Sequence, residues 1–409
     1  MKASGVIVEY NPFHNGHKFH IDQTRQISGA DVIIAVMSGN FLQRGEPALV
    51  SKWTRAEMAL RGGADLVFEL PFKYATQNAD IFACGAMSIL AAAGCSHVCF
   101  GSESGQIRDF SAALDFLEQH QQVLQASIKE NMKDGHSYPK AMALAFESLP
   151  HASPMIDLSK PNNILGLQYM AAIRKQGSSI EAFTVPRKGA GYHDENLSSS
   201  TIASATSIRK AIFSNKNQTE EVQSYLPPET LRLLNSYKQE FGQFHSWKDY
   251  WDLLQYTLLK SSGSSLSFLH GMEEGLENRM MESALHADSF QAFMESAKTK
   301  RYTWTRLQRA SLYLLLQASK EEMQPAKQGA EYLRLLGMSD TGRAYLRKHK
   351  KDFGLPLVSK ASADKERLEL DIRASRIYAL GLSGSARMRL MKKEFSEPPL
   401  MISRSSQTD

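Results

Sequence analysis

Short apolar runs alternate with longer amphipathic stretches through the first 215 residues of the chain. The runs are rich in β-branched residues and predict buried strands at 6–9, 32–37, 66–70, 97–101 and 180–185. Helical spacing of the apolar positions predicts helices near 17–28, 52–62, 78–93, 110–131, 138–147 and 162–176. Strands that alternate with helices indicate βαβ units, so we expect an α/β, Rossmann-like fold with a parallel sheet covered by helices on both faces.

The pattern changes in the second half of the chain. After Pro227-Pro228 the strand pattern disappears, and Leu, Ala, Met, Lys, Arg and Glu recur at helical spacing. A length of 409 residues also favours two or three domains over one. We therefore predict an α/β catalytic domain at 1–220 and a mostly helical part at 221–409, with a Gly- and Ser-rich loop at 186–203.

Composition places the chain among ordinary soluble proteins of a reducing compartment. It is 42% hydrophobic and 22% charged. The longest apolar run, at 83–100, is interrupted by glycines and polar residues, so no membrane span is predicted. No secretory leader precedes the first strand, and three cysteines do not suggest a disulfide framework, so we expect a cytoplasmic protein.

Charge is distributed unevenly along the chain. The whole chain has 48 Lys and Arg against 43 Asp and Glu, a net charge of +5. Residues 301–409 contain 21 of these cations and 12 of these acids, whereas the first 300 residues contain 27 and 31. A basic C-terminal part is typical of proteins that contact a polyanion, although basic helical surfaces also occur in proteins that bind none.

The clearest chemical motif lies directly after the first predicted strand. A turn at Asn11-Pro12 is followed by His14-Asn15-Gly16-His17, where a helix is expected to begin. Two histidines three positions apart share one face of a helical turn, and a glycine between them lets a bulky group approach the main chain. Because a helix N-terminus favours anions, the motif predicts a triphosphate site with His14 and His17 as catalytic residues. Without that context, such a histidine pair is more often a surface or capping feature.

A second motif, Ala-Ser-Ala-Thr-Ser-Ile-Arg-Lys at 203–210, predicts another helix N-terminus. The hydroxyl groups of Ser204 and Thr206, with the amides of the helix start, can hold phosphate oxygens, and Arg209 can add positive charge. Alone this is an ordinary helix start, and its significance comes from the pairing with the first motif.

Together the two motifs resemble those of the nucleotidylyltransferase superfamily, which pairs (His/Thr)-x-Gly-His with Ile-Ser-Ser-Thr-x-Ile-Arg. The chain departs from the second pattern at Ala203 and Ala205, which leaves one hydroxyl contact in doubt. Further stretches, at 5–17, 37–47, 52–55, 63–71 and 160–163, are similar to the bacterial tRNA(Met) cytidine acetate ligases. The similarity continues into the helical half.

The resemblance implies a specific reaction. That family uses ATP and acetate to form acetyl-adenylate and then acetylates N4 of the wobble cytidine of elongator tRNA(Met). We accordingly expect magnesium with ATP, and no acetyl-CoA, membrane or stable protein partner. The resemblance places ATP contacts on one continuous segment and four later positions: Ile7, Val8, Glu9, Tyr10, Asn11, Pro12, Phe13, His14, Asn15, Gly16, His17, Lys18, Phe19 and His20, then Gly101, Asn162, Arg187 and Lys188.

The residues suit the chemistry of the first step. Acetate is ionised at neutral pH, so its attack on the α-phosphorus needs no general base. It needs positioning, and stabilisation of charge on the α-phosphate and the leaving pyrophosphate. His14, His17, Arg187, Lys188 and the turn at 204–209 can supply both, whereas the base for the later acetyl transfer stays open.

Several other polar residues can have either a functional or a structural role. Ser38, Gly39, Asn40 and Arg44 lie where a loop can close over substrate, and Lys52 and Arg55 are either functional or part of a solvated helix face. His20 continues the histidine series away from the shared face, and Asn162 or Asn163 can cap a helix. Metal-ligand spacing is missing among Cys84, Cys95, His97 and Cys99, so no metal site is predicted there.

The leading RNA-binding candidate is the stretch 298–309. Its cations are interleaved with Tyr302 and Trp304, which suits phosphate contact and base stacking: Lys298, Lys300, Arg301, Arg306 and Arg309. The alternative is a solvated basic helix edge with the aromatic residues in the core. A second basic cluster comprises Arg343, Arg347, Lys348, Lys350 and Lys351.

Two other functions stay open. One is a nucleotidylyltransferase acting on a small phosphorylated metabolite, which leaves the basic helical half unexplained. The other is a nucleotide-sensing RNA-binding protein without turnover. No P-loop or Gly-x-Gly-x-x-Gly pattern supports a kinase or a dehydrogenase.

Overall fold

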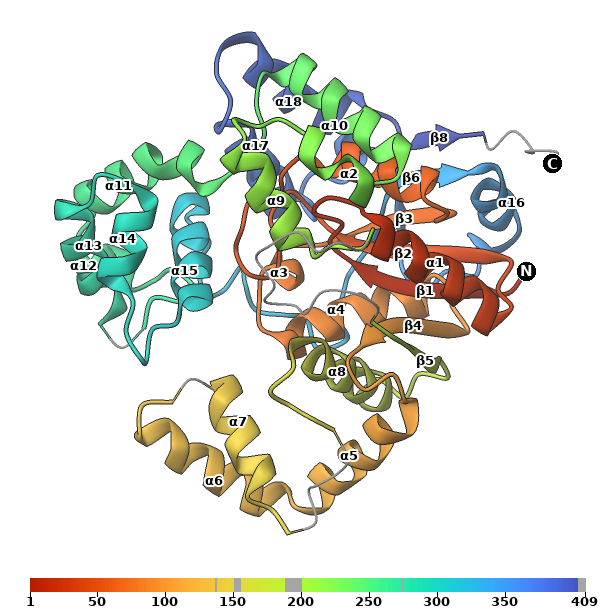
Figure 1. Ribbon diagram of the computed structural model, residues 1–409, viewed down its shortest axis with the longest axis horizontal. Coiled ribbons are helices and arrows are strands. Elements are labelled where there is room, and N and C mark those ends of the chain that lie inside the picture. The colour runs from red at the N-terminus through yellow and green to blue at the C-terminus, as the bar shows by residue number, and fades with distance from the viewer. Residues whose placement is uncertain (137, 151–155, 188–200, 274, 404–409) are drawn as a thin grey trace.

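Eight strands of the described part of the chain form one central sheet (Figure 1). The computed structural model describes residues 1–136, 138–150, 156–187, 201–273 and 275–403. The first strands are β1 (Ala3–Val8), β2 (Val32–Ser38), β3 (Leu66–Leu70), β4 (His97–Ser102) and β5 (Glu181–Pro186), all close to their predicted positions. They lie in the order β5-β4-β1-β2-β3, and every neighbouring pair is parallel. The predicted α/β fold with a parallel sheet is confirmed.

Helices cover both faces of this sheet because its strands are apolar on both sides. On one face, Ile33, Ala35 and Met37 of β2 share a core with α1 (Asn15–Ser28) and α2 (Lys52–Arg61). On the other face, Val32 and Ile34 share a second core with α4 (Ala79–Ala92) and α8 (Pro161–Lys175).

Three further strands extend the sheet beyond β3, and here the prediction that strands end before residue 227 was wrong. They are β6 (Leu333–Ser339), β7 (Leu357–Val358) and β8 (Leu400–Ile402), with β6 antiparallel to β3. The sequence Leu-Arg-Leu-Leu-Gly-Met-Ser of β6 is almost entirely buried, so it has none of the alternation that marks a half-exposed strand. The division of the chain at residue 220 stays a prediction about domains, although the sheet itself takes in residues from both sides of it.

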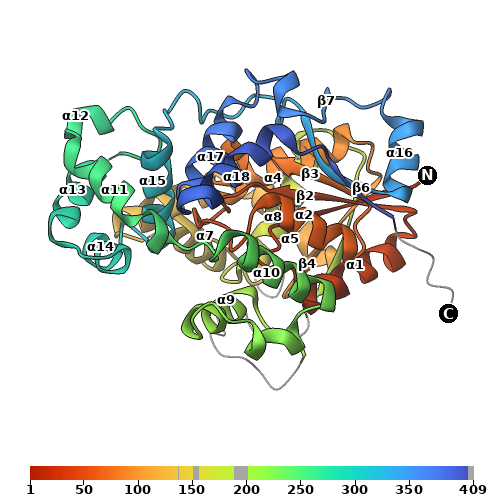
Figure 2. The same cartoon turned by 90° about the horizontal axis from the view of Figure 1, so that it is seen from above.

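Most of the remaining chain is helical and forms two projections from the sheet (Figures 1 and 2). One contains α5 (Ile107–Gln119), α6 (Gln121–Lys133) and α7 (Tyr138–Glu147). The other, which we call the helical lobe, contains α11 (Trp251–Lys260), α12 (Gly263–Leu266), α13 (Leu276–His286), α14 (Phe290–Ala297) and α15 (Trp304–Leu316). The other helices lie around the sheet: α3 (Phe72–Ala75), α9 (Ala205–Ser214), α10 (Pro228–Phe241), α16 (Asp340–His349), α17 (Glu369–Ala379), α18 (Gly384–Ser396), and the 3-10 turns Glu220–Tyr225, Trp247–Tyr250 and Ala361–Ala363. None of the described helices is long and apolar enough to cross a membrane.

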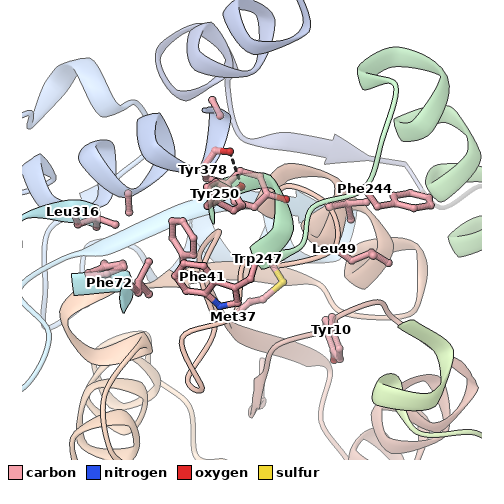
Figure 3. Close-up of a cluster of buried hydrophobic side chains, with 14 of the residues drawn as sticks. Tyr10, Met37, Phe41, Leu49, Phe72, Phe244, Trp247, Tyr250, Leu316 and Tyr378 are labelled. Atoms are coloured by element: carbon pink, nitrogen blue, oxygen red, sulfur yellow. Dashed lines mark hydrogen bonds between the residues drawn. The ribbon is translucent and has the colours of Figure 1, made fainter. Parts of the chain in front are cut away.

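The loop after β2 joins the sheet to the helical lobe. Phe41 of this loop packs among aromatic side chains of later segments, edge-on to Tyr250 and Tyr378 (Figure 3). Its backbone is also held: Trp247 Nε1 donates to the Gly45 carbonyl at 3.1 Å, and Gln308 Nε2 of α15 donates to the Arg44 carbonyl at 3.0 Å. The loop therefore has one side on the lobe and the other toward the carboxyl ends of the strands.

Lys52 and Arg55 of α2 are both fully buried, so the solvated-face interpretation was wrong for them. Lys52 Nζ lies 2.8 Å from a carboxylate oxygen of Glu69 on β3 and 2.8 Å from one of Glu394 on α18. Although burial lowers the pKa of Lys52, the carboxylates of Glu394 and Glu69 raise it above its ordinary value. Arg55 donates to the main-chain carbonyls of Glu9 and Ser38, at the ends of β1 and β2. Both cations therefore stabilise the packing of α2 against β3 and against the ends of β1 and β2.

Candidate functional site

A pocket opens at the carboxyl ends of β1, β4 and β5, the edge where the sequence predicted a nucleotide site. Its walls come from the turn after β1, the first turns of α1, the loop after β2, the starts of α8 and α9, and the end of β5. The lining residues that the sequence singled out are Ile7, Val8, Glu9, Tyr10, Asn11, His14, Gly16, His17, Phe19, His20, Arg44, Gly101, Asn162, Arg187, Ser204, Thr206 and Arg209.

The histidine motif forms the start of α1. His14 is the N-cap residue, so the helix begins at Asn15 rather than at the first histidine. His14 Nδ1 accepts the Gly16 N–H at 3.1 Å, and His17 Nδ1 accepts the His14 N–H at 3.2 Å, which closes a reciprocal capping box. The two rings stack with their centroids 3.7 Å apart. The sequence order His-x-Gly-His thus folds both imidazoles against the helix N-terminus.

Gly16 is required at its position because the His14 ring packs against its Cα atom. A Cβ atom at Gly16 would lie 2.9 Å from Cε1 of the His14 ring, too close for an ordinary contact. Any larger residue would therefore displace the ring that caps the helix. The bulky group that approaches the main chain at Gly16 is therefore the His14 ring.

Both imidazoles are neutral near pH 7. Burial, with the nearby positive charges of Arg187 and Arg209, lowers the pKa of His14 to about 3. Burial and the neighbouring His14 lower the pKa of His17 well below its usual value. Since each Nδ1 accepts a backbone hydrogen bond, the proton of each neutral ring is assigned to Nε2. The pair can therefore act as hydrogen-bond donors whose charge does not change around neutral pH.

His20 lies one helical turn beyond His17 and also lines the pocket. Burial and Arg187 lower its pKa to about 4. The pocket curves around α1 toward β4, which brings a side chain from a different face of the helix to its wall.

The second motif begins α9, as the sequence predicted. Ser204 is its N-cap residue, and its hydroxyl accepts the Ser207 N–H at 3.0 Å. Arg209 donates to the Asn11 carbonyl at 2.9 Å and forms an ion pair with Glu46 at 3.0 Å. Its guanidinium therefore joins α9 to the turn after β1 and to the loop after β2. Two helix N-termini, those of α1 and α9, face one pocket.

The opposite wall is built from β4, β5 and the start of α8. Arg187 donates to Asn162 Oδ1 at 3.4 Å, and Asn162 in turn donates to Glu103 at 2.6 Å. Neither asparagine caps α8, whose N-cap residue is Lys160, so that interpretation was wrong. Asn163 Oδ1 instead accepts the N–H groups of Glu103 and Ser104 at 3.1 and 3.2 Å, which fixes the loop after β4.

Several expected contacts lie outside the pocket lining. Pro12 and Phe13 do not line it, and Phe13 is buried against Gly62. Asn15 donates to the carbonyls of Thr201 and Ser224, and Lys18 is paired with Asp22 on the exposed side of α1. Lys188 lies outside the described residues, as does most of the loop predicted at 186–203.

The structure adds pocket residues that the sequence did not single out. Gln43 and Glu46 come from the loop after β2, and two aromatic side chains, Phe82 of α4 and Tyr169 of α8, come from helices of the opposite face. In the sequence these aromatic residues look like ordinary apolar positions of amphipathic helices, so no local signal marks them. Ser38, Gly39 and Asn40, by contrast, do not line this pocket.

The RNA candidates lie at the start of α15 and just before it. Lys298, Lys300 and Arg301 are exposed, whereas Arg306 and Arg309 are half-buried. Arg306 lies over the ring of Tyr302 at 5.2 Å. Tyr302 is buried, so its ring is not available to stack on a base and the aromatic-core alternative holds for it. Because α15 holds the loop after β2, these cations lie on the lobe that borders the pocket wall.

No group of three or more metal-ligating side chains occurs among the residues that the structure describes. Cys84, Cys95 and Cys99 are free thiols, and burial raises the pKa of Cys99 to about 11.

Comparison with known proteins places the chain in a family. A model of the HIGH nucleotidyl transferases matches residues 1–394. The tRNA(Met) cytidine acetate ligase of Lysinibacillus sphaericus is 45% identical over 403 residues, covering 98% of this chain and its whole length. The ligase of that name from Bacillus subtilis is 45% identical over 405 residues, covering 98% and 97%.

Solved structures agree with these sequence matches. The crystal structure of Thermotoga maritima TmcAL without ligand superposes with a TM-score of 0.92 at 34% identity, covering 99% of this chain and all of that one. The form of the same protein bound with alpha-thio ATP gives 0.89 at 33% identity, with the same coverage. The resemblance found in the motifs is confirmed: the chain belongs to the HIGH nucleotidyl transferase family and, within it, to the tRNA(Met) cytidine acetate ligases.

Proposed function

We propose that the protein activates acetate with ATP as acetyl-adenylate and transfers the acetyl group to N4 of the wobble cytidine of elongator tRNA(Met). The observation that carries the proposal is the convergence of two helix N-termini, with Arg187 and Arg209, on one pocket. Such ends offer unpaired N–H groups to a polyphosphate. The names of the relatives and the alpha-thio ATP in the structural neighbour support ATP as the nucleotide.

In the first step, a carboxylate oxygen of acetate attacks the α-phosphorus, and the bond to the β-phosphate oxygen breaks. His14 and His17 donate hydrogen bonds from Nε2 to the phosphate oxygens, which become more negative as pyrophosphate leaves. The start of α9 and Arg209 hold the other side of the triphosphate. Because the imidazoles are neutral, they stabilise this charge as dipoles and leave cationic neutralisation to the arginines.

Magnesium is proposed to arrive with the nucleotide. The described residues include no cluster of three or more acidic, His or Cys side chains that would hold a metal ion in a protein cage. Mg²⁺ in nucleotide sites is commonly held by substrate phosphates with few protein ligands. The ion would then supply charge neutralisation on the β- and γ-phosphates, while the residues above orient the α-phosphate.

Two assays test the proposed function. Exchange of labelled pyrophosphate into ATP is measured with and without acetate; label in cytidine and release of AMP are measured after incubation with ATP, labelled acetate and bulk tRNA. We expect acetate-dependent exchange of pyrophosphate into ATP, and label in cytidine only when tRNA is present. Exchange with a phosphorylated metabolite but not with acetate would indicate a nucleotidylyltransferase of small molecules. RNA binding without any turnover would indicate a sensor, and either result would overturn the proposal.

The helical lobe is proposed to hold tRNA through the cations of 298–309. Replacing Arg301 by Gln should weaken tRNA binding and lower the slope of log K against log salt by about 1, because one fewer counterion is released. The measurement is a salt titration of tRNA affinity by filter binding. Lys175→Gln is the matched control, because Lys175 is exposed at the end of α8 opposite the one that lines the pocket and belongs to neither basic cluster. Equal slopes for the Arg301 variant and the wild type would contradict the assignment of this surface.

A further inference from the structure

Glu9 places a carboxylate in the pocket at the end of β1. Its side chain is half-buried, and Oε1 accepts the Gln43 N–H from the loop after β2 at 2.8 Å. Oε2 has no hydrogen-bond partner among the described residues, and it is not among the polar atoms that the protein closes off. One oxygen therefore fixes the side chain, and the other faces the open space of the pocket.

Glu9 differs from the other acidic residue of the pocket lining. Glu46 is neutralised by its ion pair with Arg209 at 3.0 Å, whereas Glu9 makes no ion pair within 4 Å in the described structure. A carboxylate repels the phosphates of ATP, which the helix N-termini and arginines attract. Glu9 is therefore suited to a hydrogen-bond donor on the second substrate.

The free carboxylate oxygen of Glu9 suits the amino group of a nucleobase. Phe82 and Tyr169 line the same pocket, but they are only 3% and 5% exposed, so they form an apolar wall beside Glu9 rather than a stacking surface. Cytosine presents its exocyclic amino group as a donor, for which a carboxylate is the matching acceptor.

We propose that Glu9 recognises the amino group of the cytidine and accepts its proton during acetyl transfer. This inference rests on the proposed function and assigns the base that the sequence left open. The N4 lone pair attacks the carbonyl carbon of acetyl-adenylate, and a C–N bond forms. The bond between that carbon and the phosphate oxygen breaks, and AMP leaves with the electron pair. The N4 proton passes to Oε2 of Glu9 and is later released to water.

The electrostatic setting favours such a proton acceptor. Burial raises the pKa of Glu9 above its ordinary value, and the charge of Glu46 acts in the same direction. The Gln43 N–H, Arg44 and Arg209 oppose this and keep the charged form accessible. Tyr169 of α8 is the titratable group facing Glu9 from the opposite wall, and its own pKa is raised by burial and by Glu9.

The test separates the two half-reactions with Glu9→Gln, which keeps the shape of the side chain and removes the basic oxygen. We expect acetyl transfer to tRNA to slow by about 10²-fold or more, and this loss to exceed any loss of acetate-dependent pyrophosphate exchange by about tenfold or more. Glu9→Asp should recover part of the transfer rate. Single-turnover transfer by the wild type should fall as the pH falls through the raised pKa of Glu9, and Glu9→Gln should lose this acidic limb.

The controls keep the inference distinct from the proposed function. Glu181→Gln makes the same chemical change on an exposed residue at the amino end of β5 and should leave both half-reactions unchanged. Equal losses of exchange and transfer in Glu9→Gln, or no loss of either, would overturn the role of Glu9 while the proposed function stands. Absence of exchange and of transfer in the wild type would overturn both.

Discussion

His14→Asn is expected to reduce acetate-dependent pyrophosphate exchange by about 10²- to 10³-fold, the effect of losing one preorganised donor to a developing charge. Asparagine is a good N-cap residue, so it can still accept the Gly16 N–H that the imidazole accepts now. It does not reach as far into the pocket and cannot reproduce the Nε2–H donor. The variant should therefore keep its fold and its tRNA affinity.

Two further variants complete this experiment. His14→Ala should lose the same activity and also about 1 kcal/mol of stability, because the helix loses its cap. His17→Ala should reduce exchange by a similar factor, because it removes a second Nε2–H donor and the ring that stacks on His14. Thermal melting and tRNA binding are measured beside exchange. Exchange within fivefold of the wild type in folded His14→Asn would contradict a role for this ring at the phosphates.

Lys52→Met is expected to lower the free energy of unfolding by about 3–5 kcal/mol, because it leaves the buried Glu69 carboxylate without its ion-pair partner and leaves Glu394 with Arg334 at 3.6 Å. Lys52 is the ion-pair partner of both Glu69 and Glu394, and all three side chains are almost completely buried. Methionine has nearly the same length, so little packing is lost and the electrostatic cost dominates. Denaturant-induced unfolding followed by circular dichroism gives the comparison.

Lys393→Met is the matched control for this variant. Lys393 neighbours Glu394 on α18 and is paired with Glu240 at the surface, where both side chains are partly exposed. Such a pair contributes about 0–1 kcal/mol, so its loss should be small. A cost below about 1 kcal/mol for Lys52→Met would mean that the buried carboxylates are neutral in the folded protein.

The strands that sequence could predict are those with a local signature. β1 to β5 are β-branched runs bounded by turn residues, and their carboxyl ends correctly located the pocket. β6 carries the buried Arg334 within a Leu-rich segment, and its strand conformation depends on pairing with β3 far away in the sequence. No local pattern reports such a pairing.

Some features of the candidate site also follow from local sequence, whereas others depend on residues far away in the chain. The caps at His14 and Ser204 follow from residue order alone, because a capping side chain bonds to backbone only a few residues away. The burial of Lys52 depends on Glu394, 342 positions later, and that of Arg55 on carbonyls at the ends of two strands. Phe82 and Tyr169 reach the pocket because α4, which lies over β2 and β3, packs beside α8, which lies over β4.

The return of the chain to β6 has a consequence for how the protein is made. Leu66 of β3 pairs with Met338, and Lys52 completes its ion pairs only with Glu394. During synthesis from the N-terminus, β3 therefore leaves the ribosome with an unpaired, apolar edge. This edge stays unpaired until β6 has been synthesised more than 250 residues later. Pairings of such long sequence separation form slowly, and unpaired edges aggregate. A truncated chain that ends after the first 220 residues would keep both nucleotide motifs and still present this edge, so soluble expression of the isolated N-terminal half is expected to fail.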